Sequence, residues 1–337
     1  MKNKARLSNK VYRKIHWLLY SKLKLGKKLN GFYLAYRHRN KKPVSNDLSS
    51  IYITHVPNEG AGIGHQISNF NNGVFCAKLL GVKFAYPGFV DKKWDEFLGF
   101  GQGEKSLAQL KKEGYKFRTL PYFNESEASL DVIRKIISSY GGQKVVFKIN
   151  LDQFYQRQYD VIPFIKGKFE SAKARENDSL IYNPEHINIA VHIRRGDIVV
   201  GQTNKDASLT KRWLTMEYYE DIIKDIYSAL NGDVNSRFAN IPLLIDNKKK
   251  GAPIDIYLFS QGNEEDYRTF EKYGNVHYCL DMSPMDSFLH MVRSDILVIS
   301  KSSFSYKPAL LADGIRICPE HFWHGYPKDE KWIKVCE

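Results

Sequence analysis

Residues that can bind an anion end the short apolar segment at 187–194. Its β-branched side chains predict a buried parallel strand. The segment ends with His192 and Arg194, and Arg195 and Asp197 follow it. Open α/β sheets bind ligands at the carboxyl ends of their strands, and two guanidinium groups there can each donate paired hydrogen bonds to phosphate oxygens. The segment therefore predicts a diphosphate site, with a structural ion pair between an arginine and Asp197 as the alternative.

Two further groups in the second half of the chain suit the same ligand. Ser302 and Ser303 lie where a predicted strand at 295–299 turns into a predicted helix at 305–313. Hydroxyls and free backbone N–H groups at such a turn can hold phosphate. Asp286 begins another predicted helix, and its carboxylate can accept from the paired N–H donors that guanine presents and adenine lacks. These residues predict a guanosine diphosphate site, with a plain helix N-cap as the alternative for Asp286.

The elements that position these residues alternate between strand and helix patterns. Strands are predicted at 51–56, 82–86, 115–120, 144–149, 187–194, 254–259, 276–280, 295–299 and 315–317. Helices are predicted at 67–80, 104–113, 128–139, 152–174, 216–230, 263–272, 286–293 and 305–313. The alternation predicts an α/β protein with two Rossmann-like domains that face a cleft, at 44–180 and 181–337.

A glycine-rich turn at 60–66 separates the first predicted strand from the helix at 67–80. Strand, glycine turn, helix and strand form a βαβ unit, whose helix amino terminus is available to an anion. Contact between this turn and a ligand is one interpretation. Close packing of the helix on the sheet is the other, because glycines serve that purpose as well.

Positive charge is concentrated at the amino-terminal end of the chain. The formal net charge is +14, but residues 1–43 contain fourteen Lys or Arg and no Asp or Glu, and the rest of the chain carries 37 of each sign. Residues 10–29 show the pattern of a basic amphipathic helix. A helix lying on an anionic membrane leaflet, a solvated helix and a disordered tail all fit that pattern. The neutral remainder argues against nucleic-acid binding.

The cysteines and the apolar segments indicate in which cellular compartment the protein is expected. Cys76, Cys279, Cys318 and Cys336 show no CxxC spacing, and the sequence contains neither a secretory signal pattern nor a run of about twenty apolar residues. Reduced thiols are therefore expected. We expect a cytoplasmic protein that lies peripherally on the inner face of a bacterial membrane.

Five motifs occur in one order along roughly 52–315. Residues 62–66 match GLGNQ except at two positions, 192–197 match HxRRGD, 216–219 are similar to LDYY, 256–260 to FxxFS, and 286–305 to DMxLM…NSTFSWW. Together they resemble the motifs of the α-1,2-fucosyltransferases, glycosyltransferase family 11. A wider superfamily that includes α-1,6- and protein O-fucosyltransferases shares the arginine motif, the glycine loop and the serine turn.

The resemblance implies GDP-fucose as donor substrate, a glycan hydroxyl as acceptor, inversion at the anomeric carbon and no required metal or other cofactor. It implies a GT-B-like fold in which 44–180 faces the acceptor and 181–337 binds the GDP-sugar. No Asp-x-Asp pair, the metal tether of GT-A glycosyltransferases, occurs in the chain. Arginine is then expected to neutralise the departing diphosphate, and one such preorganised donor contributes about 3–4 kcal/mol in other enzymes.

Carried onto this sequence, the resemblance implies that Arg194 and Arg195 hold the diphosphate and assist its departure, while Asp197 orients them. The other implied donor-binding residues are His192 and Asp286 at the guanosine, Ser302 and Ser303 at the phosphate with Phe304 beside them, and Gly62, Ile63, Gly64 and His65 along the pyrophosphate.

The sequence departs from the family at two places. His65 replaces an asparagine that faces the reaction centre in related enzymes, so it is either a proton acceptor or a histidine that hydrogen-bonds locally. Residues 306–308, Tyr-Lys-Pro, replace a pair of tryptophans. Asp206 and Glu217 are two further candidates for the general base. Contact with the acceptor sugar or plain core packing is open for Trp94, Trp323, His321 and His324.

The function that fits these observations is transfer of fucose from GDP-fucose to a glycan hydroxyl, in an α-1,2 linkage. A lipid-linked or surface polysaccharide precursor suits the basic amino-terminal helix. Alternatives on the same fold are another linkage, another GDP-sugar or another acceptor, including a protein. An alternative of a different class is a catalytically silent protein that binds a sugar nucleotide or a glycan.

Overall fold

The structure, a computed structural model of the chain, describes residue 11 and residues 40–121, 123–124, 126–149, 155–199, 207–280 and 282–337. The amphipathic helix expected at 10–29 lies outside the described residues, apart from Val11, and the base candidate Asp206 lies outside them as well. Within these ranges, no helix combines the length and the apolar character that a bilayer crossing requires.

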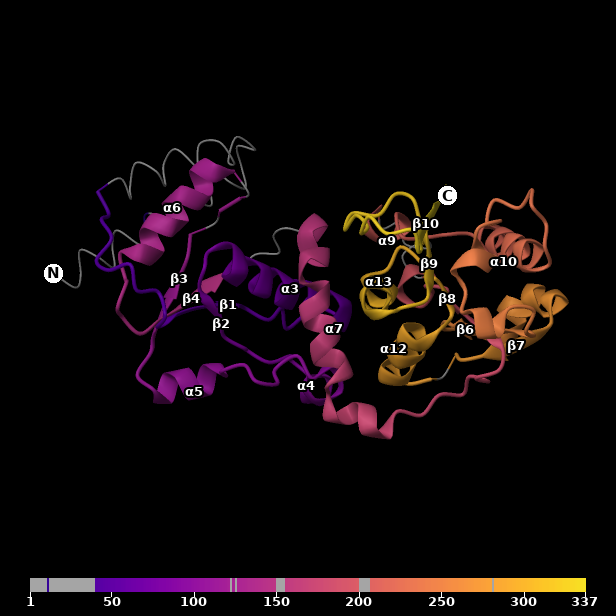
Figure 1. The fold of residues 1–337 in the computed structure, drawn as a ribbon, viewed down its shortest axis with the longest axis horizontal. Coiled ribbons are helices and arrows are strands. Elements are labelled where there is room, and N and C mark those ends of the chain that lie inside the picture. Colours follow the sequence, from indigo (N-terminus) through magenta and orange to yellow (C-terminus); the bar gives the residue numbers. More distant parts are fainter. Residues whose placement is uncertain are drawn as a thin grey trace. The chain divides into compact units, whose positions relative to one another are not determined.

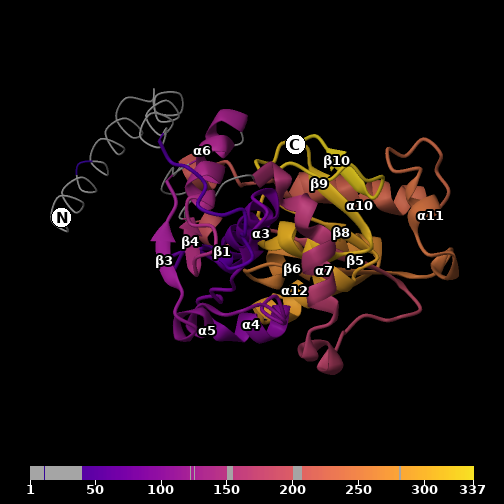
Figure 2. The ribbon, with the colours of Figure 1, turned by 60° about the vertical axis from the view of Figure 1, so that its left-hand side comes forward.

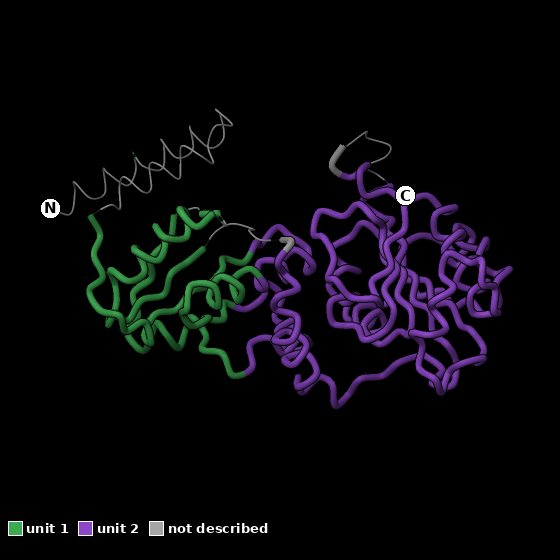
Figure 3. The backbone as a smooth tube through the Cα atoms, turned by 45° about the horizontal axis from the view of Figure 1, so that its top comes forward, with its two compact units in different colours: residues 1–57, 72–87, 103–154 green, residues 58–71, 88–102, 155–337 purple. Residues whose placement is uncertain are grey.

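Two parallel sheets with helices between their strands confirm the expected α/β class (Figure 1). Contacts divide the chain into two compact units (Figure 3). Unit 1 comprises 1–57, 72–87 and 103–154, and unit 2 comprises 58–71, 88–102 and 155–337. The domain boundary expected at residue 180 stays a prediction, and it falls inside unit 2.

Unit 1 is built on a four-stranded parallel sheet in the order β2-β1-β4-β3. Its strands are β1 (Ile51–His55), β2 (Lys83–Phe84), β3 (Lys116–Thr119) and β4 (Val145–Ile149), and its helices are α5 (Leu107–Lys112), α6 (Glu127–Ser138) and the second half of α3 (Ile63–Leu79). Every residue of the central strand β1 is buried, whereas the edge strand β3 is largely exposed. This contrast is typical of a parallel sheet whose central strands are covered on both faces.

Unit 2 contains a six-stranded parallel sheet in the order β10-β9-β8-β5-β6-β7. Its strands are β5 (Ile187–His192), β6 (Ile254–Phe259), β7 (Asn275–Tyr278), β8 (Ile296–Val298), β9 (Ile315–Pro319) and β10 (Trp332–Val335). Counted from β5, this is the 3-2-1-4-5-6 order of the Rossmann fold, in which the chain reverses its direction of travel between β5 and β8. The strand β5 pairs with β8 on one side and with β6 on the other, and Val191 is in register with Val298. Figure 2 labels the three strands in a second view.

Helices connect these strands and cover the sheet of unit 2. They are α4 (Lys92–Leu98), η2 (Tyr155–Val161), α7 (Ile162–Glu170), η3 (Lys173–Asn177), α9 (Ala207–Thr210), α10 (Met216–Leu230), α11 (Ile241–Leu244), η4 (Asn247–Lys249), η5 (Glu264–Tyr273), α12 (Pro284–Arg293) and α13 (Ser303–Leu311). The helix α10 has the bounds predicted from sequence. Thr215 caps it, and Tyr219, Ile222 and Ile226 bury one face against the core, as a 3.6-residue period requires.

An aromatic cluster explains why residues 88–102 belong to unit 2. Trp94 and Phe97 of α4 place their rings 5.7 and 5.8 Å from the ring of Phe288 on α12. Phe169 of α7 lies 6.3 Å from Phe288, and the guanidinium of Arg175 stacks 4.0 Å from the Phe169 ring. Each such aromatic pair contributes about 0.5–1.5 kcal/mol beyond its buried area, so the cluster fastens α4 and α7 to α12.

Several elements differ from the sequence-based expectations, among them the helix predicted at 152–174, whose described part consists of the separate helices η2, α7 and η3. The strand at 315–319 is not the last one, because β10 follows it and pairs with it in parallel. The helix α4 was not predicted, and the segment expected as a helix at 263–272 is the 3-10 helix η5. The strands β10 and β7 are the two edges of the sheet, where the apolar pattern is weakest because one side meets solvent.

Candidate functional site

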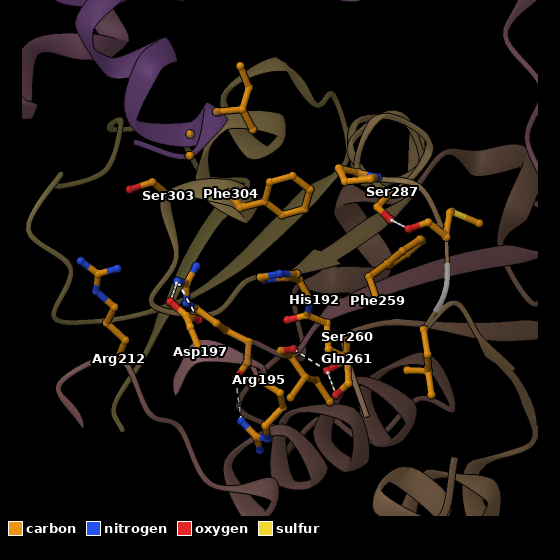
Figure 4. Close-up of a pocket in the computed structure, with 18 of the residues that line it drawn as sticks. His192, Arg195, Asp197, Arg212, Phe259, Ser260, Gln261, Ser287, Ser303 and Phe304 are labelled. Atoms are coloured by element: carbon orange, nitrogen blue, oxygen red, sulfur yellow. Dashed lines mark hydrogen bonds and ion pairs between the residues drawn. The ribbon is translucent and has the colours of Figure 1, made fainter. Parts of the chain in front are cut away.

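A cavity of about 690 Å³ lies at the carboxyl ends of β5, β6 and β8 in unit 2, a volume typical of small-molecule sites. This is the switch point of the sheet, where open α/β folds bind their ligands. Its walls are formed by Gly62, Ile63, Gly64, His65, Trp94, residues 192–195, Asp197, Arg212, residues 259–261, Leu280, Met282, Pro284, Ser287, Ser303 and Phe304 (Figure 4). The sheet thus brings the predicted arginine motif, glycine turn and serine turn into one cavity.

His192 is the last residue of β5, and its ring forms part of the cavity wall. Its Nδ1 lies 2.7 Å from the hydroxyl of Ser300, and the side chain is 8% exposed. Burial, and secondarily the charge of Arg194, lower the pKa of His192 to about 3. The ring is therefore neutral at physiological pH and offers a hydrogen bond without a charge. Its predicted contact with guanosine stays a prediction.

Two side chains accept hydrogen bonds from Arg194, and one of its donors has no acceptor among the described residues. Its Nη1 donates to Ser302 Oγ at 3.0 Å, and its Nη2 donates to both carboxylate oxygens of Asp197 at 2.8 and 3.1 Å. Its Nε is buried and has no hydrogen-bond partner in the described part of the chain. A buried donor without an acceptor costs about 1–3 kcal/mol.

Arg195 is directed into the scaffold. It is 9% exposed, and its Nη1 donates to the carbonyl oxygens of Arg194 at 2.9 Å and Leu214 at 3.2 Å. Its guanidinium lies 4.2 Å from the Trp213 ring. Figure 4 shows the guanidinium turned away from Ser303, although Arg195 still lines the cavity. The diphosphate contact predicted for Arg195 stays a prediction.

Asp197 contacts the predicted partner, Arg194, and no hydrogen bond of its carboxylate to Arg195 is found among the described residues. The turn that brings it there depends on Gly196, whose φ of 66° lies in the left-handed region. A residue with a side chain is strained at this φ, which favours glycine at this position. The side chain of Asp197 is 55% exposed. Its ion pair with Arg194 therefore contributes orientation more than stability.

The serine turn contributes one residue to the cavity and one to its support. Ser302 is the N-cap of α13: its Oγ accepts from Phe304 N at 3.2 Å and from Arg194, and it lies outside the cavity lining. Ser303 lines the cavity, and its Oγ lies 3.0 Å from His324 Nε2. The ring of Phe304 lies 5.6 Å from that of His192. The phosphate roles predicted for the two serines stay predictions.

The glycine turn packs directly on the serine turn. A Cβ placed on Gly64 would lie 2.6 Å from the carbonyl carbon and oxygen of Ser303 and 2.8 Å from Phe304 N. A Cβ placed on Gly62 would meet no atom within 4 Å. The two glycines therefore have different roles: Gly64 allows close approach of two backbones, and Gly62 leaves open space beside the cavity.

Asp286 lies in a neighbouring cavity of about 790 Å³, which shares Leu280 and Met282 with the first. It is not the helix N-cap, because α12 begins at Pro284 and is capped by Ser283. Asp286 Oδ2 accepts from Ser283 Oγ at 2.7 Å. Its carboxylate is exposed and available to a ligand that spans the two cavities, and the predicted guanine contact stays a prediction.

Two of the three base candidates, His65 and Glu217, lie in the described part of the chain. His65 lines the cavity at the start of α3. Glu217 is exposed and lies outside the lining, and hydrogen bonds from its own backbone and from Thr215 lower its pKa. Asp206 lies outside the described residues. Of the three, His65 is the one that the structure places at the cavity.

Sequence reasoning missed Arg212, which lies just before α10 and lines the cavity. Its guanidinium lies 5.3 Å from the Trp323 ring, and Trp323 is 44% exposed. By contrast, His324 is 1% exposed and Trp94, although in the cavity wall, packs on Phe288. The sequence could have suggested Arg212, because it is a basic residue in the polar loop that follows the arginine motif.

The fold and the cavity define a class: an α/β protein whose six-stranded parallel sheet holds an anion-suited cavity at its switch point. No protein-family model matches the chain, and no curated protein matches it. The chain is similar to the crystal structure of POFUT1 in complex with GDP-fucose, with a TM-score of 0.47 and 14% sequence identity over 81% of this chain and 96% of that chain.

Two further solved structures are similar. POFUT1 in complex with GDP gives a TM-score of 0.44 and 16% identity, covering 79% of this chain and 98% of that one. The fucosyltransferase NodZ from Bradyrhizobium gives a TM-score of 0.38 and 9% identity, covering 78% of this chain and 94% of that one.

Proposed function

We propose that the chain is an inverting glycosyltransferase that moves fucose from GDP-fucose to a hydroxyl of a glycan acceptor. The observation that carries the proposal is Arg194, which lines a cavity at the switch point of a Rossmann-order sheet and whose buried Nε has no hydrogen-bond partner among the described residues. Guanidinium groups at such a place suit a diphosphate. The motif resemblance supplies the identity of the donor.

In the proposed reaction the acceptor oxygen attacks the anomeric carbon while the bond from that carbon to the phosphate oxygen breaks. GDP leaves with an added negative charge, and Arg194 together with the amino terminus of α13 stabilises it. The contacts of Arg194 with Ser302 and Asp197 fix its guanidinium before the substrate arrives. Preorganisation of this kind contributes about 3–4 kcal/mol per donor.

The acceptor hydroxyl must lose its proton as the new bond forms. Two residues of the cavity wall besides His192 can accept it, His65 and Asp197. Asp197 already accepts two hydrogen bonds from Arg194, which weakens it as a base. The proposal therefore assigns the proton to His65, whose imidazole can accept it through a ring nitrogen.

An exposed aromatic ring beside the cavity suits the sugar acceptor. Trp323 is 44% exposed and stacks with Arg212 of the cavity wall. An apolar ring with a cation beside it offers a sugar both a flat face and hydrogen-bond donors. Trp323→Ala should then raise the KM for the glycan acceptor and leave GDP-fucose hydrolysis unchanged.

The proposed linkage is α-1,2, because the motifs at 192–197 and 286–305 resemble those of the α-1,2-fucosyltransferases. Another linkage, another GDP-sugar or a protein acceptor is compatible with the same cavity, since the residues named above recognise the diphosphate rather than the acceptor. A catalytically silent binding protein is the alternative of a different class.

A donor screen tests the proposal. Full-length protein is incubated with GDP-fucose, GDP-mannose or UDP-sugars and glycan acceptors; GDP or UDP release is measured, and the linkage of any product is determined. We expect GDP release from GDP-fucose, loss of that release in Arg194→Ala, and retention in the exposed control Arg268→Ala. Turnover of a UDP-sugar in place of GDP-fucose would refute the donor assignment. GDP binding with no turnover of any donor would favour the silent binder.

We also propose that the basic segment at 10–29 holds the protein on the cytoplasmic face of a membrane. The support is its composition, with fourteen cationic and no acidic residues in 1–43, since each basic residue near an anionic surface contributes about 1 kcal/mol. Vesicles of anionic lipid should sediment the full chain but not a chain lacking 1–43. Equal sedimentation of both chains would contradict the proposal.

A further inference from the structure

A continuous chain of buried hydrogen bonds leads from a lysine in the core to the hydroxyl of Ser303 in the cavity wall. Lys307 Nζ donates to Gln158 Oε1. Gln158 Nε2 lies 2.9 Å from His324 Nδ1, and His324 Nε2 lies 3.0 Å from Ser303 Oγ. Lys307, Gln158 and His324 are each 1% exposed. The four residues come from η2, α13 and the loop before β10, and all belong to unit 2.

The chemistry of the lysine sets the direction of every bond in this chain. An ammonium group only donates, so it requires the oxygen of the Gln158 amide as acceptor. The NH₂ group of Gln158 then faces His324 and donates to Nδ1. The reverse orientation of the amide would set its NH₂ donors against the ammonium, which is unfavourable because both groups only donate.

The histidine transmits this direction to Ser303. Burial, and secondarily the charges of Lys307 and His65, lower the pKa of His324 to about 2, so its ring is neutral and carries one proton. Because Nδ1 accepts from Gln158, that proton lies on Nε2, and Nε2 donates to Ser303 Oγ. The hydroxyl oxygen of Ser303 is then an acceptor within the protein, and its own proton is available to the cavity.

We propose that Lys307, Gln158 and His324 are positioning residues that make Ser303 a hydrogen-bond donor toward a phosphate oxygen of the ligand. The inference rests on the proposed function in one respect, that the ligand is a diphosphate. We call the hydrogen-bonded series Lys307, Gln158, His324 and Ser303 the relay. Through it the positive charge of Lys307 orients the Ser303 hydroxyl, while the ammonium group itself stays in the core.

The segment that departs from the resembled family supports this relay. The Tyr306 ring stacks on the His324 ring at 4.9 Å with an interplanar angle of 11°, and Lys307 Nζ lies 5.2 Å from the Tyr306 ring. The Tyr306 hydroxyl donates to the Gly325 carbonyl at 3.0 Å, which fixes the loop that carries His324. Tyr306 and Lys307 thus occupy the place of two tryptophans and provide a different means of supporting the cavity wall.

The protonation of His324 can be read without any ligand. Nitrogen chemical shifts of ¹⁵N-histidine in the full-length protein distinguish a ring protonated at Nε2 from one protonated at Nδ1. We expect His324 to be protonated at Nε2 alone between pH 6 and 8. A proton on Nδ1, or on both nitrogens, would overturn the relay whether or not the protein transfers fucose.

Binding of inorganic pyrophosphate and of GDP, measured by calorimetry, tests the end of the relay at Ser303. Gln158→Glu keeps the lysine contact but presents only acceptors to Nδ1, so it should move the His324 proton to Nδ1 and make Ser303 donate to the ring instead of the ligand. Loss of one hydrogen bond to an anion lowers affinity by about 10- to 100-fold. Ser303→Ala should produce the same loss, and Ser303→Thr should retain affinity because it keeps the hydroxyl.

A double-mutant comparison separates this role from a structural one. If the relay acts through Ser303, Gln158→Glu should add nothing to the loss already caused by Ser303→Ala. Gln143→Glu, at an exposed position of unit 1, controls for the added negative charge. Additive losses, or a Ser303→Ala variant that binds pyrophosphate as tightly as the parent, would overturn the proposal. Pyrophosphate binding without a preference for GDP would overturn the proposed donor and leave the relay intact.

Discussion

Replacement of Gly64 by alanine tests whether the glycine turn sets the position of the serine turn. The added Cβ would lie 2.6 Å from the carbonyl carbon and oxygen of Ser303 and 2.8 Å from Phe304 N. Ordinary contacts between such atoms are about 3.5–4.0 Å, so the two turns must move apart by roughly 1 Å. The obstructing atoms belong to the backbone, and no side-chain rotation can relieve the contact.

The magnitude follows from that displacement. Inserting one carbon into a packed region costs about 1–3 kcal/mol, which corresponds to a fall in Tm of roughly 2–12 °C for a unit of about 200 residues. A misplacement of about 1 Å at a binding site lowers the rate by up to about 100-fold. Gly64→Ala should therefore lower both the Tm, measured by circular dichroism, and the affinity for GDP, measured by calorimetry.

Two alanine variants serve as controls. Gly167 lies on an exposed side of α7, and a Cβ added there would meet no atom within 4 Å, so Gly167→Ala should keep GDP affinity and leave the Tm equal or higher. Gly62 also has open space around it, so Gly62→Ala should keep the Tm. A Gly64→Ala variant that matches Gly167→Ala in both Tm and GDP affinity would refute the close approach of the two turns.

Four further predictions concern charge and composition. Arg194→Ala should lower GDP-fucose turnover by about 100- to 1,000-fold with a small change in Tm. Arg195→Ala should instead lower the free energy of unfolding by about 2–4 kcal/mol, because its contacts with the carbonyl groups and with Trp213 are lost. Equal Tm values for the two variants would contradict a binding role for Arg194 and a supporting role for Arg195. The free energy of unfolding should fall as pH drops from 6.5 toward 3, by about 1.4 kcal/mol per pH unit for each buried histidine. The cause is that the pKa values of His192 and His324 are lowered to about 3 and about 2 in the folded protein, so the unfolded state takes up protons first. Urea titrations at pH 4.5 to 7 measure this dependence on pH, which should be weaker in His192→Gln than in the parent. Chelation by EDTA followed by dialysis should leave turnover unchanged, and restoration by Mg²⁺ or Mn²⁺ would contradict the predicted independence of metal. Turnover on soluble acceptors should survive deletion of 1–43, and a large loss would show that the basic segment takes part in the reaction.

Local patterns were sufficient to predict the central strands and the residues that follow them. The apolar run at 187–194 predicts a strand, and a strand end fixes where His192 and Arg194 lie relative to the sheet. The same reasoning holds for Ser303, which begins the helix α13 after the short turn that follows β8. Since parallel strands place their carboxyl ends at one edge, proximity of these residues follows from the pattern alone.

Contacts between distant segments could not be predicted in the same way. Gln158 and His324 are 166 positions apart, and neither stands in a periodic pattern that would pair them. The attachment of α4 to unit 2 depends on Trp94 and Phe288, which read as ordinary core aromatics in the sequence. The position of Asp286 also needed the structure, because its helix starts two residues earlier than predicted and Ser283 takes the cap.

The adjacent arginines show how one motif divides into a ligand contact and a support. Both Arg194 and Arg195 line the cavity, but their guanidinium groups have different partners. Arg194 contacts Ser302 and Asp197, while Arg195 ties the end of the strand to the carbonyl of Leu214 and to the ring of Trp213. Arg212 precedes this tied segment immediately and lines the cavity. Arg195 therefore acts on the proposed diphosphate site through the segment it holds, and its loss should disturb two cationic side chains of the cavity at once.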